Sequence, residues 1–392
     1  MKIIIVLIAV LPVFTAARAQ SPPGTQTQSP VNSLIGLVSD SADGKPLAGV
    51  SIFLNSTSKG TVSHEDGSFL LKGIPRGQYD LVVSAIGYET FVITINGSRL
   101  PHALKIVLHA KAAELAAVTV EPYLKNGWQQ WGRFFLDNFI GTIENANHCH
   151  IKNRSILRFH FYKKSNRLSV TAAEPLIIEN DALGYDLQYK LEAFVSDFNS
   201  HVITYYGYPY FREMSTTSES RRLRWEQHRQ IAYQGSMMNF MRSLYAGHAP
   251  EEGFTLQQQV SVPNQEKRRV QAIYHPDTQP ADTFPIDTLH HFWEVLRQPD
   301  HFSQTITVPP DSLVNANADQ TRSLFFSGTL TVLYKDEKQK IDQGSRLKLI
   351  TPALVRFEEN GNYYPPQEVL TTGFWGQTEK IANLLPLDYG QP

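Results

Sequence analysis

The chain has 392 residues, with 36 basic and 37 acidic side chains and no long run of either charge, so its composition gives no electrostatic case for nucleic-acid binding. A chain of this length can bury a sizeable core and is expected to form two domains. Its only cysteine, Cys149, excludes an internal disulfide, so packing alone must stabilise the fold.

The first 19 residues have the pattern of a secretory signal peptide. Lys2 gives a positive start, an apolar run extends from Ile3 to Val10, and Ala17-Arg18-Ala19 gives an A-x-A exit. The apolar run is shorter than the roughly 20 residues that span a bilayer, which argues against the alternative of an N-terminal membrane anchor. No later segment is apolar enough to span a membrane. We therefore expect residues 1–19 to be cleaved from an exported chain that has no transmembrane segment.

Residues 20–32 contain mostly Gln, Ser, Thr and Pro, and we expect them to form a flexible leader. Residues 33–110 then alternate between apolar and polar side chains in short stretches, which indicates strands with one buried face. The alternating apolar residues are Ile35, Leu37, Val50, Ile52, Leu54, Phe69, Leu71, Tyr79, Leu81, Val83, Ala85, Phe91, Ile93, Ile95, Leu104, Ile106 and Leu108. A further short strand is expected at residues 61–63.

Turn residues separate these stretches, and Asp66-Gly67 is expected to close a tight hairpin because Gly adopts a positive φ without a Cβ penalty. Seven short strands without a helix predict a small β-sandwich. The core of this sandwich is expected to contain Phe69, Tyr79, Leu81, Val83 and Ile93, and a helix between Val50 and Ile95 would contradict the prediction.

Several segments of residues 33–110 resemble the carboxypeptidase regulatory-like domain. They are Gly36-Leu37-Val38, Pro46-Leu47-Ala48-Gly49-Val50, Gly60-Thr61, Asp66-Gly67-Ser68-Phe69, Gly77-Gln78-Tyr79 and Ser84-Ala85-Ile86-Gly87-Tyr88-Glu89. The resemblance implies an all-β, seven-stranded transthyretin-like (prealbumin-like) sandwich. It also implies an exported envelope protein of a Gram-negative bacterium, located in the periplasm or at the outer-membrane or cell surface.

Residues 111–126 are interpreted as a linker. Within it, Leu115–Val120 resembles the connector that follows this domain in TonB-dependent receptors, but too few residues remain for the large barrel of such a receptor. Residues 127–392 are interpreted as an α+β domain with a large antiparallel sheet. Segments such as Pro175–Tyr185 and Gly373-Phe374-Trp375-Gly376 resemble the C-terminal part of uncharacterised exported proteins, a resemblance that implies no activity.

The second domain opens with an aromatic stripe at helical spacing, formed by Trp128, Trp131, Phe135 and Phe139. This spacing predicts an amphipathic helix, whose aromatic face is either core or a ligand platform. Strands are expected at 156–162, 168–172, 175–178, 185–195 and 202–211, then at positions between 324 and 357. The strand at 185–195 is expected to be solvated on one face. Helices are expected at 220–244 and 288–296.

A zinc carboxypeptidase would need an H-x-x-E motif and a distant downstream His. The motif occurs at His248–Glu251 and His291–Glu294, but neither has a third ligand at the required separation. His148-Cys149-His150 also lacks a visible third ligand, so surface histidines beside a buried Cys are the simpler interpretation. The sequence therefore predicts no metal, no cofactor and no catalytic residue.

Three weaker candidate sites remain. Tyr205, Tyr206, Tyr208, Tyr210 and Phe211 form either a sugar-stacking surface or ordinary sheet core. The arginines Arg221, Arg222, Arg224 and Arg229 form either a basic patch for anionic lipid or polysaccharide or a solvated helix face. The carboxylates Glu174, Glu179 and Asp181 could form a glycosidase pair only if the fold places two of them a few ångströms apart.

These patterns favour a non-catalytic exported envelope protein that binds a protein or glycan partner. One alternative is a structural or assembly component of the outer-membrane surface. The other is a hydrolase, either a zinc carboxypeptidase or a glycosidase, with an unrecognised site. We rank a binding role first because the loops of a β-sandwich place binding residues at the surface and the sequence contains no complete catalytic motif.

The aromatic stripe gives a first prediction. If its side chains form the core of the second domain, Trp131→Ala should reduce the free energy of unfolding by roughly 3–5 kcal/mol. Thermal melting of the variant measures this loss. An unchanged melting temperature would instead identify the stripe as an exposed docking surface.

Overall fold

The computed structural model describes residues 32–111, 123–278, 283–334, 344–351 and 354–390. The expected signal peptide, nearly all of the expected leader and residues 112–122 of the expected linker lie outside the described residues. No helix in the described ranges is long and apolar enough to cross a membrane.

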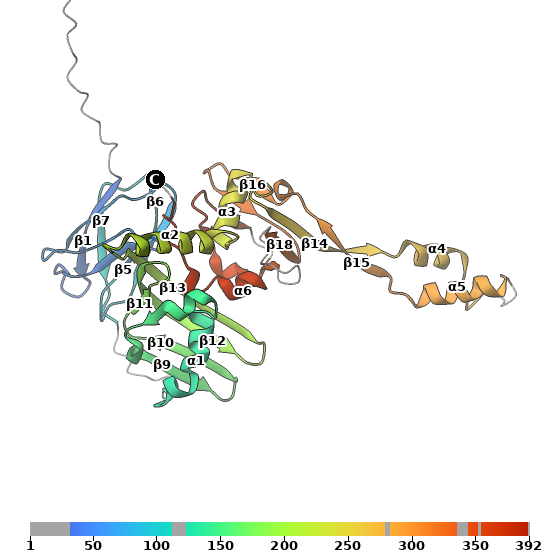
Figure 1. Ribbon diagram of the computed structural model, residues 1–392, viewed down its shortest axis with the longest axis horizontal. Coiled ribbons are helices and arrows are strands. Elements are labelled where there is room, and N and C mark those ends of the chain that lie inside the picture. The colour runs from blue at the N-terminus through green and yellow to red at the C-terminus, as the bar shows by residue number, and fades with distance from the viewer. Residues whose placement is uncertain (1–31, 112–122, 279–282, 335–343, 352–353, 391–392) are drawn as a thin grey trace, which may run out of the picture. The chain divides into compact units, whose positions relative to one another are not determined.

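Residues 33–108 form the expected seven-stranded sandwich (Figure 1). Its strands are β1 (Ser33–Asp40), β2 (Ser51–Leu54), β3 (Gly60–Val62), β4 (Ser68–Lys72), β5 (Gln78–Ser84), β6 (Phe91–Asn96) and β7 (Leu104–Leu108). One sheet has the order β4-β1-β7 and the other β3-β2-β5-β6; the β1–β7 pair is parallel and the others are antiparallel. Phe69, Tyr79, Leu81 and Val83 are buried in the core as expected, and Ile93 is partly buried against it.

Two local predictions for the sandwich are wrong. In β1 the buried residues are Leu34 and Val38, whereas Ile35 and Leu37 are about half exposed. Gly36 lies between the buried pair and also faces inward, where a Cβ would come within 2.5 Å of the Phe69 ring. Because glycine has no apolar side chain, the inward positions 34, 36 and 38 do not read as an alternating apolar pattern in the sequence. Asp66-Gly67 does not close a hairpin, because β3 and β4, on either side of it, belong to different sheets.

A second layer is built from a six-stranded antiparallel sheet that packs on helix α1 (Gly127–Phe139). Its strands are β8 (Cys149–Ile151), β9 (Leu157–Tyr162), β10 (Arg167–Ala172), β11 (Leu176–Asn180), β12 (Tyr185–Asp197) and β13 (Val202–Glu213). The short 3-10 helices η1 (Glu144–His148) and η2 (Arg154–Ile156) precede β8 and β9. The α+β architecture expected for this part of the chain is therefore confirmed.

The aromatic stripe lies on α1 as its spacing predicts. Phe135 and Phe139 are fully buried, and Trp128 and Trp131 are partly buried against the same core. Trp131 stacks on Phe161 at a centroid distance of 5.4 Å. Because Trp131 keeps some exposure, we expect the loss caused by its truncation to lie near the lower end of the stated range, at about 3 kcal/mol.

The strand β12 is not simply solvated on one face, as its sequence pattern predicts. Gln188 and Glu192 are exposed, but Lys190 on the same face is only 7 % exposed. The sandwich contacts this face: Tyr210 of the neighbouring strand β13 packs on Phe53 at a centroid distance of 5.3 Å, and the Thr90 hydroxyl donates to Glu192 at 3.3 Å. Part of the outer face of this sheet is therefore an internal junction with the N-terminal domain.

The helix expected at 220–244 is interrupted. Helix α2 (Glu219–Tyr233) ends before Gly235, which has a φ of +71°, and α3 (Met237–Ala246) begins after Ser236. The Ser236 hydroxyl accepts a hydrogen bond from the Asn239 N–H at 3.1 Å and thus caps α3. The continuous apolar pattern conceals this break because both helices face the interior.

The remaining strands form two further sheets around a third large hydrophobic core. The sheet of order β15-β14-β18-β19-β22 contains β14 (Phe254–Pro263), β15 (His301–Thr307), β18 (Thr329–Tyr334), β19 (Ser345–Leu349) and β22 (Val369–Thr372). The sheet of order β16-β17-β20-β21 contains β16 (Val314–Ala316), β17 (Arg322–Leu324), β20 (Val355–Phe357) and β21 (Tyr363–Tyr364). The short helices η3 (Pro310–Ser312) and η5 (Pro366–Glu368) lie between these strands, and α6 (Phe374–Thr378) and η6 (Ile381–Asn383) follow β22.

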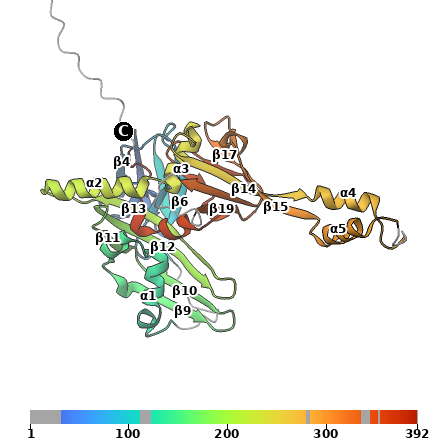
Figure 2. The same ribbon diagram turned by 45° about the vertical axis from the view of Figure 1, so that its right-hand side comes forward.

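Strands β14 and β15 continue into a two-helix tip, which the sequence only partly predicts. Helices α4 (Gln265–Ile273) and α5 (Ile286–Arg297) lie at the end of the two strands, away from the other elements (Figures 1 and 2). The tip has its own small core, in which Val270, Leu289 and Phe292 are buried. Every residue of β15 is exposed.

The segment from Trp375 to Tyr389 joins all three large cores. Trp375 belongs to the core between the two later sheets, Ile381 and Leu385 belong to the core of the α1 layer, and Leu387 belongs to the core of the sandwich. The Leu387 N–H donates to the carbonyl of Ser56 at 2.6 Å. These contacts link the sandwich to residues more than 300 positions later in the chain.

Arg242 of α3 fixes this segment. Its guanidinium donates to the carbonyl oxygens of Asn360 at 2.9 Å, Tyr389 at 3.0 Å and Leu387 at 3.1 Å. Asp388 adds a hydrogen bond from the Ser58 N–H at 2.9 Å and an ion pair with Lys59 at 3.3 Å. Glu358 also accepts from the Gln78 N–H at 2.6 Å, so the sandwich is attached at two separate places.

We expect Leu387→Ala to reduce the free energy of unfolding by about 2–5 kcal/mol, because it leaves a cavity in the sandwich core. Leu223→Ala, which truncates a leucine that is 51 % exposed on α2, is the matched control and should change stability by less than about 0.5 kcal/mol. Thermal and denaturant unfolding measure both. Equal effects would show that Leu387 does not tie the sandwich to the rest of the protein.

Candidate functional site

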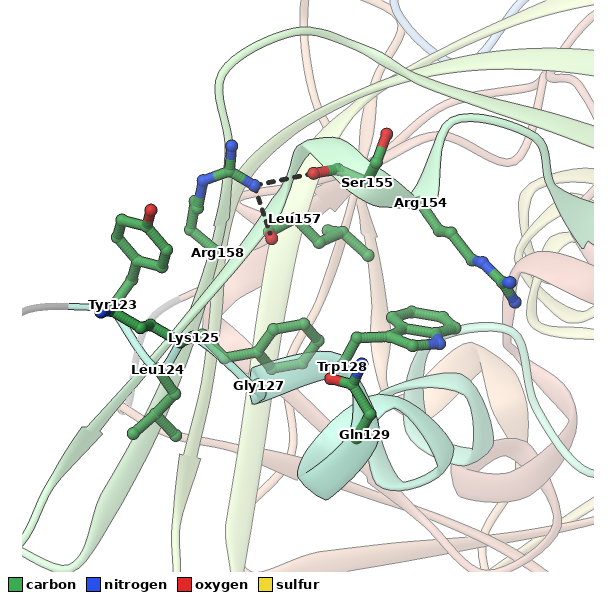
Figure 3. A pocket seen from close by; sticks show the side chains of 11 residues that line it. Tyr123, Leu124, Lys125, Gly127, Trp128, Gln129, Arg154, Ser155, Leu157 and Arg158 are labelled. Carbon is green, nitrogen blue, oxygen red and sulfur yellow. Dashed lines mark hydrogen bonds between the residues drawn. The ribbon is translucent and has the colours of Figure 1, made fainter.

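A pocket of about 260 Å³ opens at the start of α1 (Figure 3). It lies between the beginning of this helix and the segment formed by η2 and the start of β9. Its lining residues are Tyr123, Leu124, Lys125, Gly127, Trp128, Gln129, Arg154, Ser155, Leu157, Arg158 and Phe159. The lining thus combines aromatic and cationic side chains, and it contains no Asp, Glu, His or Cys.

Close packing between α1 and β9 positions this pocket. A Cβ on Gly127 would lie 2.6 Å from the Cβ of Phe159, so glycine is needed where the helix begins. The Leu124 N–H donates to the Phe159 carbonyl at 2.8 Å, and the Gly127 N–H donates to the Leu124 carbonyl at 2.9 Å. These bonds hold the residues before the helix against the strand and bring Tyr123 and Trp128 beside the arginines.

Two of the three aromatic side chains in the lining, Tyr123 and Trp128, are each paired with an arginine. The guanidinium of Arg154 lies 5.3 Å from the Trp128 ring centroid, and that of Arg158 lies 5.2 Å from the Tyr123 ring centroid. Both distances are within the range of cation–π attraction. Arg158 also donates to the carbonyls of Ser155 at 2.7 Å and Leu157 at 3.1 Å, as Figure 3 shows. The two pairs stand on different sides of the pocket.

The start of α1 adds further positive potential. Its N-cap residue, Asn126, makes no side-chain capping bond, and the first turn contains no acidic residue. The N–H groups of Trp128 and Gln129 belong to this first turn, where a helix supplies no acceptor of its own. The positive end of the helix dipole is therefore not offset by a local carboxylate.

Sequence reasoning did not select this pocket. Trp128 was interpreted as part of the core stripe, and Tyr123, Arg154 and Arg158 carried no motif. These residues become neighbours only because β9 pairs with the residues before α1. The sequence contains two weak signals: the aromatic stripe with Trp128, one interpretation of which is a ligand platform, and two arginines four residues apart, a spacing too common to identify a site.

The tyrosine cluster selected from the sequence is divided between the two faces of β13. Phe211 is fully buried against Tyr185, and Tyr205 packs on Phe139 at a centroid distance of 5.3 Å. On the other face Tyr210 contacts the sandwich, Tyr208 is partly buried and Tyr206 is 48 % exposed. The structure does not bring Tyr205, Tyr206, Tyr208, Tyr210 and Phe211 onto one exposed surface.

The candidate metal motifs are separated from one another. His248 and Glu251 are exposed in the loop after α3, and His291 lies 3.5 Å from Glu266 of α4. Cys149 is buried between two exposed histidines, and burial raises the pKa of its thiol to about 12. Among the described residues, no group of three or more His, Cys, Asp or Glu side chains is placed to hold a metal ion.

The arginines of α2 and the nearby carboxylates largely neutralise one another. Arg221 pairs with Asp181, Arg222 pairs with Glu219 and Glu226, and Arg229 pairs with Glu213. Glu179 pairs with Lys152 at 2.7 Å. Both Glu179 and Asp181 thus have cationic partners, and Arg224 is exposed. The structure favours a solvated helix face over a basic patch here.

Residues 34–120 match the family model of the CarboxypepD_reg-like domain. This part of the chain is a carboxypeptidase regulatory-like domain. The match confirms the resemblance inferred from its turn and core residues. No curated protein matches the chain.

Solved structures with low similarity include two Bacteroides proteins. One, from Bacteroides fragilis, is provisionally described as membrane-associated and of unknown function; it shares 11 % identity over 87 % of this chain and 94 % of its own, with a TM-score of 0.16. A DUF3823 family protein from Bacteroides uniformis shares 10 % identity over 88 % and 99 %, with a TM-score of 0.16.

A cohesin–X-dockerin complex from Acetivibrio cellulolyticus shares 19 % identity over 20 % of this chain, with a TM-score of 0.18. The matched region spans 57 % of that neighbour's length. At these TM-scores none of the three similarities supports a conclusion about fold or function.

Glu379, which follows α6, provides a pH-dependent prediction. Burial raises the pKa of its carboxyl to about 7, although its oxygen accepts a hydrogen bond from the Met237 N–H at 3.1 Å. The folded protein therefore holds this proton more tightly than the unfolded chain does, and the free energy of unfolding should fall as the pH rises from about 4.5 to about 7. Glu379→Gln should remove this pH dependence and make the variant more stable than the wild-type chain at pH 8.

Denaturant unfolding between pH 4 and pH 8 measures the effect. The matched control is Glu174→Gln, which changes an exposed carboxylate and should leave the pH profile of stability unchanged. If the pH profile of stability of Glu379→Gln matched that of the wild-type chain, the Glu379 carboxyl would not be the source of the pH dependence.

Proposed function

We propose that this chain is a non-catalytic exported envelope protein of a Gram-negative bacterium that binds a glycan through the pocket at the start of α1. The carboxypeptidase regulatory-like domain and the signal-peptide pattern of residues 1–19 support the envelope location. The observation that carries the binding role is the pair of arginine–aromatic stacks in one pocket.

The shape and chemistry of the pocket suit a sugar. Tyr123 is 52 % exposed, and a flat aromatic face complements the C–H face of a sugar ring. Arginine side chains and helix N–H groups supply the donors that hydroxyl and acidic groups require. The volume of about 260 Å³ is slightly below the range of roughly 300–1,000 Å³ for drug-sized ligands, so it suits a terminal sugar rather than an extended chain.

The lining favours binding over catalysis. Glycoside hydrolysis generally uses two carboxyl groups that flank the scissile bond, and peptide hydrolysis by zinc uses three protein ligands and a water. None of the lining residues is a carboxylate, histidine or cysteine. The residues that are present can orient and retain a ligand, and none of them is a carboxylate or an imidazole that could act as a general base.

The two-helix tip supports a second candidate role, in assembly with a protein partner. Ile286 at the start of α5 is 82 % exposed, Trp293 is 50 % exposed, and Phe302 on β15 is 46 % exposed. Exposed apolar side chains of this size on an extended element are typical of protein contacts. This supports the structural or assembly alternative, and the two roles are compatible.

Binding of fluorescent surface oligosaccharides to the purified chain tests the glycan role. We expect Tyr123→Ala to weaken binding at least tenfold, which corresponds to about 1.4 kcal/mol. Tyr206→Ala is the matched control, because Tyr206 is similarly exposed and belongs to the tyrosine cluster on β13. If Tyr206→Ala lost binding and Tyr123→Ala did not, the binding site would lie on β13. If the chain released new reducing ends from the oligosaccharides, the hydrolase alternative would be favoured.

A further inference from the structure

We infer that the sugar bound at the start of α1 carries an anionic group, a carboxylate or a phosphate ester, which Arg154, Arg158 and the first turn of the helix recognise. This inference rests on the proposed function, because it names the class of glycan for the same pocket.

The first argument is local charge. The chain as a whole is almost neutral, with 36 basic and 37 acidic side chains. The pocket departs from this balance, because Lys125, Arg154 and Arg158 line it and no acidic side chain does. A concave surface with charges of one sign raises the local concentration of the opposite ion. The pocket therefore favours an anion over a neutral sugar.

The second argument comes from how the arginines are held. By contrast, Arg222 and Arg229 of α2 are paired with carboxylates, and Arg242 of α3 donates to three carbonyl oxygens. In the part of the chain that the structure describes, neither Arg154 nor Arg158 has a carboxylate at ion-pair distance, and both are exposed. The planar guanidinium suits the oxygens of a carboxylate or phosphate, which it can bind with two parallel hydrogen bonds.

The third argument is preorganisation. The Trp128 ring holds the Arg154 guanidinium, and the Tyr123 ring and two carbonyl oxygens hold that of Arg158. Less side-chain entropy is then lost when an anion binds. The first turn of α1 adds N–H donors that neither a capping side chain nor an acidic residue offsets. Figure 3 shows the two arginines on different sides of the pocket, so the anion and the sugar ring would lie between them.

The experiment compares matched ligands on the purified chain by calorimetry. Cellobiose is the neutral ligand, cellobiouronic acid adds a carboxylate, and cellobiose 6′-phosphate adds a phosphate ester. We expect at least one acidic ligand to bind tenfold or more tightly than cellobiose, with an advantage that falls as NaCl rises from 50 to 500 mM. Preference for the carboxylate over the phosphate, or the reverse, identifies the natural anion.

The variants Arg154→Gln and Arg158→Gln should each remove most of the advantage of the acidic ligand. Arg133→Gln is the matched control, because Arg133 is exposed on the same helix outside the pocket and should leave binding unchanged. Far-UV circular dichroism and thermal melting confirm that each variant is folded. Since both pocket arginines are exposed, their substitution should not disturb the core.

The outcomes separate this inference from the proposed function. Equal affinity for cellobiose and both acidic ligands, with loss in Tyr123→Ala, overturns the anionic preference and leaves the glycan role standing. No binding of these ligands or of surface oligosaccharides overturns both. Binding of phosphatidylglycerol vesicles or of a poly-glutamate peptide with the same sensitivity to Arg154→Gln, tighter than that of any sugar, overturns the choice of a saccharide.

Discussion

The contact between Arg242 and the carbonyl oxygens of Asn360, Leu387 and Tyr389 holds together parts of the protein that are far apart in sequence. A guanidinium can satisfy several carbonyl acceptors at once in a fixed geometry, which a lysine cannot. Around it the segment after Trp375 contributes apolar side chains to three separate cores. Further contacts of the sandwich with the rest of the protein are made by Gln78 with Glu358 and by Phe53 with Tyr210 of β13.

Local patterns in the sequence account for most of the fold. The period-two alternation and the turn residues between the stretches predict the sandwich, because most of its strands bury one face in the core. The prediction failed where a glycine took an inward position, as Gly36 does beside Phe69, and where a helical pattern continued through the break at Gly235. In both places a backbone requirement outweighed the periodicity of apolar side chains.

The candidate site could not be predicted in the same way. In sequence, Tyr205 and Phe211 fit either a sugar-stacking surface or ordinary sheet core, and β13 directs both toward the core that α1 covers. Arg154 and Arg158 look like ordinary surface arginines until β9 places them beside the helix start. A binding pocket built from isolated residues on different elements leaves no local pattern, because its members are defined by tertiary contacts and not by spacing.

The attachment of Leu387 and Asp388 to the sandwich also affects how the protein can be made. The hydrogen bond from Ser58 to Asp388 joins residues that are 330 positions apart, so it closes a very long loop. During synthesis the sandwich emerges first, yet one apolar position of its core stays unfilled until Leu387 arrives. Contacts between residues so far apart in sequence slow folding and lengthen the time during which apolar surface is exposed. The N-terminal domain would therefore complete its packing only after nearly the whole chain has been made.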